Sequence, residues 1–81
     1  MSASVYEERK KLRKNLLEEI YNHYFTNGGA PYSITRSELD VDRNKKLALE
    51  YLKEKGYISA EPFGAQYKIK PTALGIDAVE N

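Results

Sequence analysis

The spacing of the apolar residues changes part-way along the chain, and this change restricts the possible folds more than any other feature. In the first third, Leu12, Leu16 and Ile20 recur every four residues, which is the spacing of a helix with one buried face. In residues 66–70 apolar and polar residues alternate, as they do in a strand with one buried face. We therefore expect an α+β fold.

The first helix is expected over about residues 5–26. Ser4 and Glu7 have the spacing of a capping box, in which a hydroxyl and a carboxylate satisfy free backbone groups at a helix start. Gly28-Gly29 follows the stripe, and glycine readily takes the left-handed conformation that ends many helices. The stretch Arg9 to Lys14 near the start of this helix is the densest basic run in the chain.

Two further helix starts follow. Thr35, with Glu38 three residues later, repeats the capping pattern and predicts a very short second helix. Asp42 is a good N-cap for a third helix over about residues 43–55, which Gly56 ends. From a rotation of 100° per residue, we expect the inward face of this third helix to hold Leu47, Ala48, Tyr51 and Leu52, with Leu49 at its edge.

Two strands and a closing helix complete the expected order. The strands are predicted over residues 57–61 and 66–70, around a turn at residues 62–65. Residues 73–80 are predicted to form the closing helix, and residues 32–34 a connector or a brief strand. Within the second strand, Tyr67 and Ile69 share one face, and the opposite face holds Gln66, Lys68 and Lys70.

Length and composition limit the chain to one small domain. A chain of 81 residues and 9.3 kDa supports one modest core, so we expect a single domain over residues 1–81 whose first few residues can be disordered. No apolar run approaches the roughly 20 residues of a membrane-spanning helix, and no signal-peptide pattern opens the chain. The absence of cysteine excludes disulfides and thiolate metal sites, and a cytoplasmic location is expected.

Catalysis has little support in the sequence. His23 is the only histidine, and its place beside the apolar stripe is explained by packing. With no cysteine and one histidine, a histidine or cysteine metal cluster cannot be assembled. Gly28-Gly29 follows a helix rather than a strand, which is the wrong place for a phosphate-binding loop. We therefore expect no enzymatic activity, no cofactor and no bound metal.

The order of helix, short helix, helix, hairpin and helix resembles that of winged helix-turn-helix domains. The segment Ala48–Ile58 is similar to the L-x-x-L-x-x-x-G-hydrophobic-I ending of that family's recognition helix. The segment Ile69–Asp77 is similar to the I-x-x-T-x-x-G stretch that leaves the second wing strand, and the resemblance covers roughly residues 12–80. It implies a three-helix core, a two- to three-stranded β-wing, a short C-terminal helix and double-stranded DNA as the partner.

A narrower resemblance links the chain to the small YjcQ-like winged-helix proteins of bacteria and phages. It rests on the compact acidic turn before the third helix and on the run Leu52–Ile58. The chain departs from the wider family in its second helix, because only about six residues separate Thr35 from Asp42. A second helix this short gives less support on the phosphate backbone, which puts DNA binding in doubt.

In a winged helix the N-terminal half of the third helix enters the major groove. Arg43, Asn44 and Lys46 are the expected groove contacts, since arginine can pair with guanine and asparagine with adenine. The expected contacts to the DNA backbone are Arg36, Lys53, Gln66, Lys68 and Lys70. With these contacts the chain would act as a small transcriptional regulator of bacterial or phage type.

The same residues also fit a solvated charged surface. Glu50 lies in the middle of the expected DNA-facing side, where a carboxylate repels phosphate, and the net charge of the chain is only +1. Three more acids lie nearby: Glu38, Asp40 and Asp42. The alternative function is a winged-helix protein-interaction module without DNA binding, anchored by exposed tyrosines and by Phe63 at the wing tip.

The first turns of the first helix extend beyond the part that so small a domain can cover. Because Val5 and Tyr6 lie there, we expect a homodimer formed through the first helix and the C-terminal helix. The basic run Arg9 to Lys14 either touches phosphate beside a binding site or forms a solvated helix face. No membrane association is expected, because acids interrupt that basic face.

Overall fold

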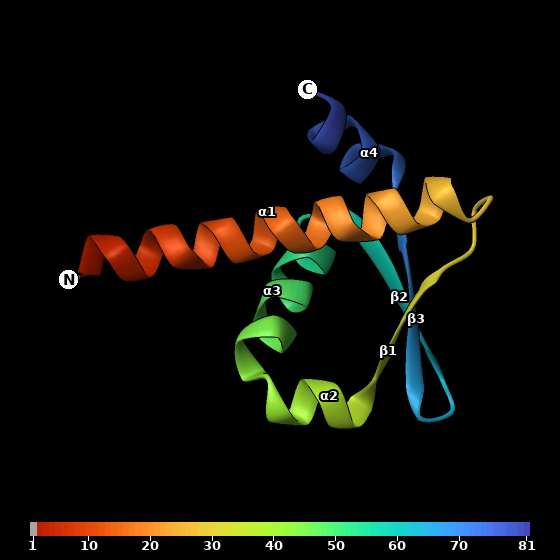
Figure 1. The fold of residues 1–81 in the computed structure, drawn as a ribbon, viewed down its shortest axis with the longest axis horizontal. Helices are drawn as coiled ribbons and strands as arrows, with labels where there is room; N and C mark the ends of the chain where they lie inside the picture. The colour runs from red at the N-terminus through yellow and green to blue at the C-terminus, as the bar shows by residue number, and fades with distance from the viewer. Residues whose placement is uncertain (1) are drawn as a thin grey trace.

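Four helices and three strands follow one another along the part of the chain that the structure describes (Figure 1). The structure is a computed structural model that describes residues 2–81, with side chains from residue 4 onward. The elements in chain order are α1 (Ser2–Thr26), β1 (Tyr32–Thr35), α2 (Arg36–Val41), α3 (Arg43–Glu54), β2 (Ile58–Phe63), β3 (Gln66–Pro71) and α4 (Ala73–Glu80). The expected α+β class is confirmed.

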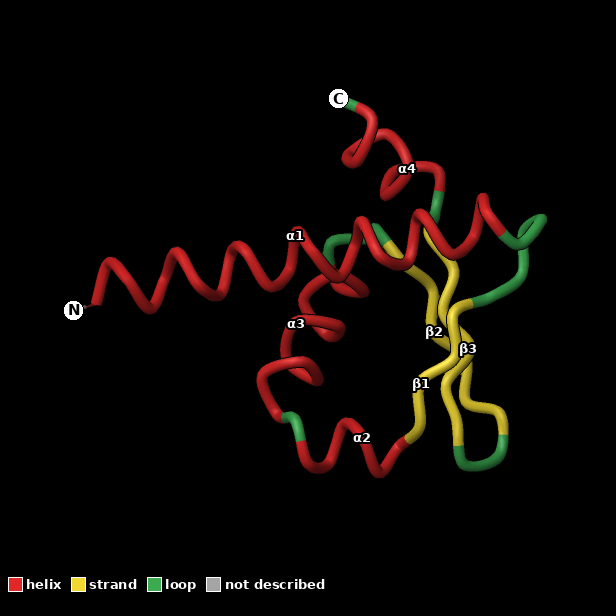
Figure 2. The backbone as a smooth tube through the Cα atoms, in the orientation of Figure 1, coloured by secondary structure: helices red, strands yellow, loops and turns green. Residues whose placement is uncertain are grey.

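The three strands form one antiparallel sheet in the order β1-β3-β2 (Figure 2). Residues 32–34, predicted as a connector or a brief strand, lie in β1, which extends to Thr35, and Ile34 pairs with Tyr67 of the central strand. The sheet turns one face to the helices, because Ile34 and Ile69 are buried whereas Ser33 and Lys70 are exposed. The predicted alternation in β3 is confirmed.

The hairpin between β2 and β3 is tighter than the sequence suggested. Its loop has only two residues, Gly64 and Ala65, and the pair Phe63–Gln66 closes it. Gly64 has a φ of 63°, which is the positive φ that the first loop position of a type II′ turn requires. The predicted four-residue turn over residues 62–65 is therefore wrong, because Pro62 and Phe63 belong to β2, an edge strand that tolerates proline.

The core lies between the helices and the sheet, and every element except α4 contributes a large apolar side chain to it. Burial of each such side chain stabilises the fold by about 1.5–3 kcal/mol. The buried apolar residues are Leu16, Leu17, Ile20, Ile34, Leu39, Ala48, Leu49, Leu52, Ile58 and Ile69. From α4, Val79 packs against this cluster from the edge.

The predicted inward face of α3 is partly wrong. Ala48 and Leu52 are buried as expected, but Leu47 is 61% exposed and Tyr51 is 40% exposed, whereas Leu49 is buried. The reason is that α3 packs against α1 on one side and β2 on the other. Its buried stripe is centred between these two neighbours, on Leu49 and Leu52, rather than on the side of Tyr51.

α1 begins earlier than predicted, so the capping box is wrong. The helix already includes Ser2, which places Ser4 inside its first turn. Once the packed part of a helix has formed, adding a residue is far easier than starting a new helix, and no glycine or proline interrupts the chain here. The expected disorder of the first residues concerns in part Met1, which lies outside the described residues.

α4 joins the body where α3 ends, and this joint contains both segments that carry the family resemblance. At the end of α3, Gly56 N–H donates to the carbonyl of Lys53 and Tyr57 N–H to that of Leu52, the two bonds of a Schellman motif. Thr72 caps α4 by accepting from Gly75 N–H at 3.1 Å, and its own hydroxyl donates to the Gly56 carbonyl. The two segments are therefore hydrogen-bonded to each other.

Candidate nucleic-acid interface

A groove runs between the helices and the inner face of the sheet, and we call it the helix–sheet groove. Its volume is about 440 Å³, its floor is apolar, and its rim is charged. The floor is formed by Leu39, Leu49, Ala60, Tyr67 and Ile69, and the rim by Arg36, Asp40, Lys46, Glu50 and Lys53. Three of the cations predicted to contact DNA therefore lie on one groove, although they come from two helices.

The backbone of Arg36 is hydrogen-bonded to the hairpin loop, and its side chain lies over Tyr67. Its N–H donates to the carbonyl of Ala65 at 2.9 Å, so the first residue of α2 is attached to the hairpin loop. Its guanidinium lies 5.3 Å from the centre of the Tyr67 ring, within the range of a cation–π contact. The start of α2 is also fixed, because the Thr35 hydroxyl accepts from Glu38 N–H at 3.2 Å, as predicted.

Lys46, Glu50 and Lys53 occupy one flank of α3, spaced by four and three residues along the helix. All three are exposed, and Glu50 lies between the two lysines in sequence. Because both lysines are exposed, their ammonium groups can extend into solvent. The groove rim carries three positive and two negative side chains, so its positive field is local and modest.

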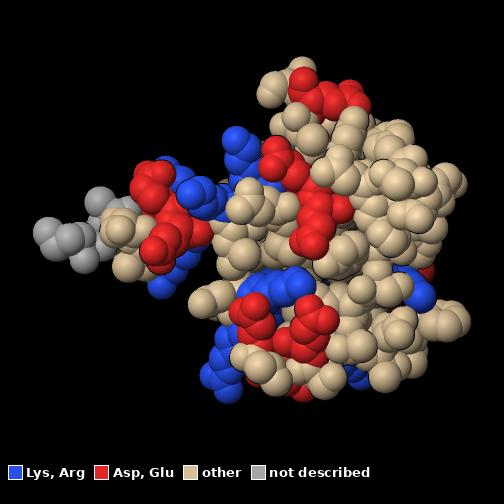
Figure 3. Space-filling view, in the orientation of Figure 1, with Lys and Arg blue, Asp and Glu red and all other residues tan. Residues whose placement is uncertain are grey.

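The charges elsewhere are mixed rather than gathered in one patch. Figure 3 shows basic and acidic side chains interleaved over the projecting half of α1 and around α2 and α3. In the same view, the surface over the sheet and the end of α1 is largely uncharged. A single extended basic face is therefore not visible from this side.

The structure separates the three predicted groove contacts. Arg43 is exposed at the start of α3, where the Asp42 carboxylate caps the helix by accepting from Lys45 N–H at 3.1 Å. Lys46 lies in the helix–sheet groove, but Asn44 lies on the opposite flank of α3, facing α1. The spacing of the two residues accounts for this split, because two positions along an α-helix turn a side chain by about 200°, so Asn44 and Lys46 cannot share a flank of α3. Helix geometry could have shown this from the sequence.

The three predicted contacts on the wing lie on the outer face of the sheet, away from the helix–sheet groove. Lys68 Nζ donates to Ser33 Oγ at 2.9 Å and to Gln66 Oε1 at 3.4 Å. The same ammonium lies 5.7 Å from the centre of the Phe63 ring. Lys70 is exposed on this face. A ligand in the helix–sheet groove would not meet these residues.

An ion pair that the sequence analysis missed joins α2 to α3. Lys45 Nζ lies 2.7 Å from Glu38 Oε2, and the lysine side chain is only 17% exposed. Partial burial disfavours the charged lysine and is the largest single influence, but the hydrogen bond to Glu38 together with the charges of Tyr32, Glu38 and Glu19 outweighs it and raises the pKa of Lys45 above its usual value. The ion pair places a positive charge beside Glu38, which offsets part of the negative charge expected beside α3.

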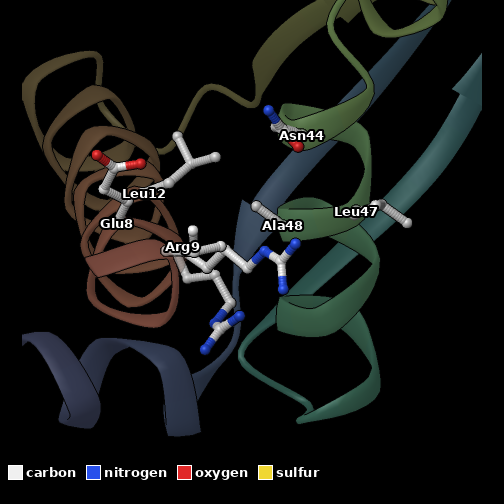
Figure 4. Close-up of a pocket in the computed structure, with 8 residues that line it drawn as sticks. Glu8, Arg9, Leu12, Asn44, Leu47 and Ala48 are labelled. Atoms are coloured by element: carbon white, nitrogen blue, oxygen red, sulfur yellow. The ribbon is translucent and has the colours of Figure 1, made fainter. Parts of the chain in front are cut away.

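A second groove, the α1–α3 groove, lies on the other flank of α3 and has a volume of about 360 Å³. Its lining comes from α1 (Val5, Glu8, Arg9, Leu12 and Arg13) and from α3 (Asn44, Leu47 and Ala48). Figure 4 shows Asn44 and Ala48 on the side of α3 toward α1, with Leu47 projecting from the outer side of that helix. The Arg13 guanidinium lies 4.2 Å from the centre of the Tyr51 ring.

The His23 side chain packs against Tyr32 and lies beside the Asn27 amide. Its ring meets the Tyr32 ring edge-on at 5.6 Å between centres, and its Nδ1 lies 3.3 Å from the Asn27 side-chain amide. Within residues 2–81, no group of three or more histidine or acidic side chains is placed to hold a metal ion. None of the described helices is both long and apolar enough to span a membrane.

Comparisons with protein-family models, with curated proteins and with solved structures found no match to this chain.

Proposed function

We propose that the chain is a winged-helix DNA-binding protein that contacts duplex DNA with α3 and with the rim of the helix–sheet groove. The order of its elements and the β1-β3-β2 sheet are compatible with that fold. The observation that carries the proposal is the convergence of Arg36 from α2 and of Lys46 and Lys53 from α3 on the rim of the helix–sheet groove. In this arrangement the first turn of α3, with Arg43, enters the major groove.

The three cations would act on the phosphate backbone. Neutralising one phosphate releases condensed counterions, and the logarithm of the binding constant falls by about 0.9 for each tenfold rise in salt. Three contacts therefore give a salt slope of about −3. Asp40 and Glu50 lie on the same rim and repel phosphate, so we expect weak non-specific affinity, in the micromolar range or weaker at physiological salt.

The test is a titration of labelled random-sequence duplex with the full chain at about 50 mM and 200 mM salt. The proposal predicts binding that weakens with a slope of about −3. A random sequence is sufficient, because the backbone term does not depend on the bases. If the protein does not bind at the lower salt concentration, the proposal is wrong.

A second candidate function is a protein-interaction module, and one observation favours it. Phe63 is 70% exposed beside the hairpin loop, and its ring lies 5.7 Å from the ammonium of Lys68. Exposed aromatic side chains are common anchors of protein interfaces. Under this function, Phe63→Ala removes partner binding and Lys46→Glu leaves it unchanged, whereas DNA binding responds to these substitutions in the opposite way.

A further inference from the structure

The first turns of α1 project away from the body of the protein (Figure 1). Every residue from Ser4 to Lys11 is exposed, and the first buried side chain of α1 is Leu16. This projecting segment nevertheless carries Val5, 41% exposed, and Tyr6, 58% exposed. These apolar side chains are thus exposed to solvent, on a segment that contributes no buried residue to the core.

One face of α1 is formed by Val5, Glu8 and Arg9 of the projecting segment and by Leu12, which follows it and is half-buried against the core. Their spacing of three and four residues places them in one row, and together they line the α1 side of the α1–α3 groove. Across the groove, α3 adds Leu47, which is 61% exposed. Among the described residues, neither Glu8 nor Arg9 takes part in an ion pair within the chain.

When this row is set against a second copy that runs in the opposite direction, each apolar residue faces an apolar residue and each acid faces a base. We propose that this face pairs with the same face of a second copy of the chain, the two α1 helices running antiparallel about a two-fold axis between Glu8 and Arg9. In this pairing Val5 meets the partner's Leu12, and Glu8 meets the partner's Arg9. Each contact occurs twice, as the symmetry of an isologous dimer requires.

The pairing is specific because the reverse orientation is unfavourable. Two parallel helices in register would bring Glu8 beside the partner's Glu8 and Arg9 beside the partner's Arg9, so like charges would face each other. The antiparallel arrangement instead gives two opposite-charge contacts between two apolar contacts. Leu47 of each chain lies at the border of this surface and adds apolar area to it.

α4 has no part in this interface, although the sequence suggested that it would. It packs against the C-terminal half of α1 in its own chain, where the Tyr21 hydroxyl donates to Glu80 Oε2 at 2.7 Å. The dimer surface is formed by α1 and α3 alone. The inference does not depend on DNA binding, and its test uses no DNA.

The test measures the mass of the full chain by sedimentation equilibrium at concentrations up to about 1 mM. The wild type is expected to reach twice the 9.3 kDa of one chain. Glu8→Arg and Arg9→Glu each place like charges opposite one another at both crossings, so each raises the dimer dissociation constant about tenfold or more. Mixing the two variants restores opposite charges at both crossings and therefore restores the dimer.

The matched control is Lys11→Glu, a charge reversal on the other side of the same helix turn. It is expected to leave the dimer unchanged. Because positions 8, 9 and 11 are exposed, all three variants should unfold at the temperature of the wild type when a thermal scan is made at a concentration where the wild type is monomeric, since dimerisation itself raises the unfolding temperature. The inference is overturned if the wild type stays monomeric, if the two single variants associate as the wild type does, or if their mixture does not associate.

Discussion

The two exposed flanks of α3 differ in chemistry, although they belong to one helix of twelve residues. The flank toward the sheet carries Lys46 and Lys53 around Glu50, over an apolar groove floor. The flank toward α1 carries Asn44, Leu47 and Tyr51, and faces a helix that projects into solvent. We propose the first flank as the surface for a polyanion and the second as part of the surface for another copy of the chain.

This difference shows how a small domain can present two surfaces without a second core. The buried stripe of α3, formed by Ala48, Leu49 and Leu52, occupies the wedge between α1 and the sheet. The exposed residues on either side of the stripe, such as Lys46 and Leu47, are available for binding. Substitutions in the stripe should change stability, whereas substitutions on one flank should change one kind of binding and leave the other intact.

The largest effect is expected in the buried stripe itself. Leu52 is 2% exposed, and Leu52→Ala removes its packing and leaves a cavity between α1 and the sheet, at a cost of about 3 kcal/mol in the free energy of unfolding. Urea denaturation followed by circular dichroism measures this cost. Leu47→Ala, on the exposed flank, is the matched control and should cost less than about 0.5 kcal/mol. Equal losses from the two variants would remove the distinction between stripe and flank.

The next effect concerns the joint that positions the end of α3. A Cβ on Gly75 would lie 2.0 Å from the carbonyl oxygen of Tyr57, a backbone atom that cannot move alone. Gly75→Ala should therefore destabilise the fold by about 2 kcal/mol and loosen α4. The same denaturation experiment measures it, with Ala78→Ser at an exposed position of α4 as the control. A fully stable Gly75→Ala variant would mean that this close contact does not form.

A smaller effect is expected where Arg13 covers Tyr51. Arg13→Gln removes the cation–π contact on the α1 flank and should cost about 0.5–1 kcal/mol of stability. Lys14→Gln, one residue further along α1 and exposed, changes the same charge without losing a ring contact. If the two variants are equally stable, the contact of Arg13 with Tyr51 does not stabilise the protein, and Tyr51 does not belong to the packed contact between α1 and α3.

The smallest effect is a dependence on alkaline pH at the ion pair between α2 and α3. The pKa of Lys45 is raised in the folded protein, so its contribution to stability is complete below the usual lysine pKa of about 10.4 and is lost as the pH rises through the folded value. The charges of Glu38, Tyr32 and Glu19 raise the pKa of this lysine. The pKa of Tyr32 is itself raised, mainly by burial, so its contribution to stability is also lost as the pH rises.

Lys45→Met should reduce the loss of stability between about pH 9 and pH 11. Thermal unfolding in a series of buffers measures this loss, and Lys46→Met, one residue along on the sheet-side flank, is the control. A wild type and a Lys45→Met variant with identical pH profiles would show that the pair does not hold α2 against α3.

The sequence predicted the order of the elements and several helix ends well, because helix caps depend on neighbouring residues. The caps at Thr35 and Asp42 and the glycine stop at Gly56 were each predicted from two or three adjacent positions. The start of α1 was missed, since the Ser4 spacing fits a cap and only the observed helix shows that the turn before it is also helical.

The candidate site was predicted less well, because it depends on how α3 is rotated. A pattern of apolar residues gives the face of a helix only to within a neighbour or two, and here that error exchanged Tyr51 for Leu49 in the core. The placement of Asn44 and Lys46 on opposite flanks, by contrast, was predictable, because residues two positions apart do not share a face of an α-helix. The ion pair of Lys45 with Glu38 joins two helices through tertiary packing, and no local pattern indicates it.

The measurement that tests the proposed DNA contact most directly is a comparison of two double variants at about 50 mM salt. Lys46→Glu with Lys53→Glu reverses two charges on the sheet-side flank of α3, and Lys11→Glu with Lys14→Glu reverses two exposed charges on the far side of α1. The titration uses labelled random-sequence duplex and both full-length variants. We predict that the first variant loses at least about tenfold in affinity and that the second binds nearly as the wild type does. Equal losses from the two variants would contradict a DNA surface on α3.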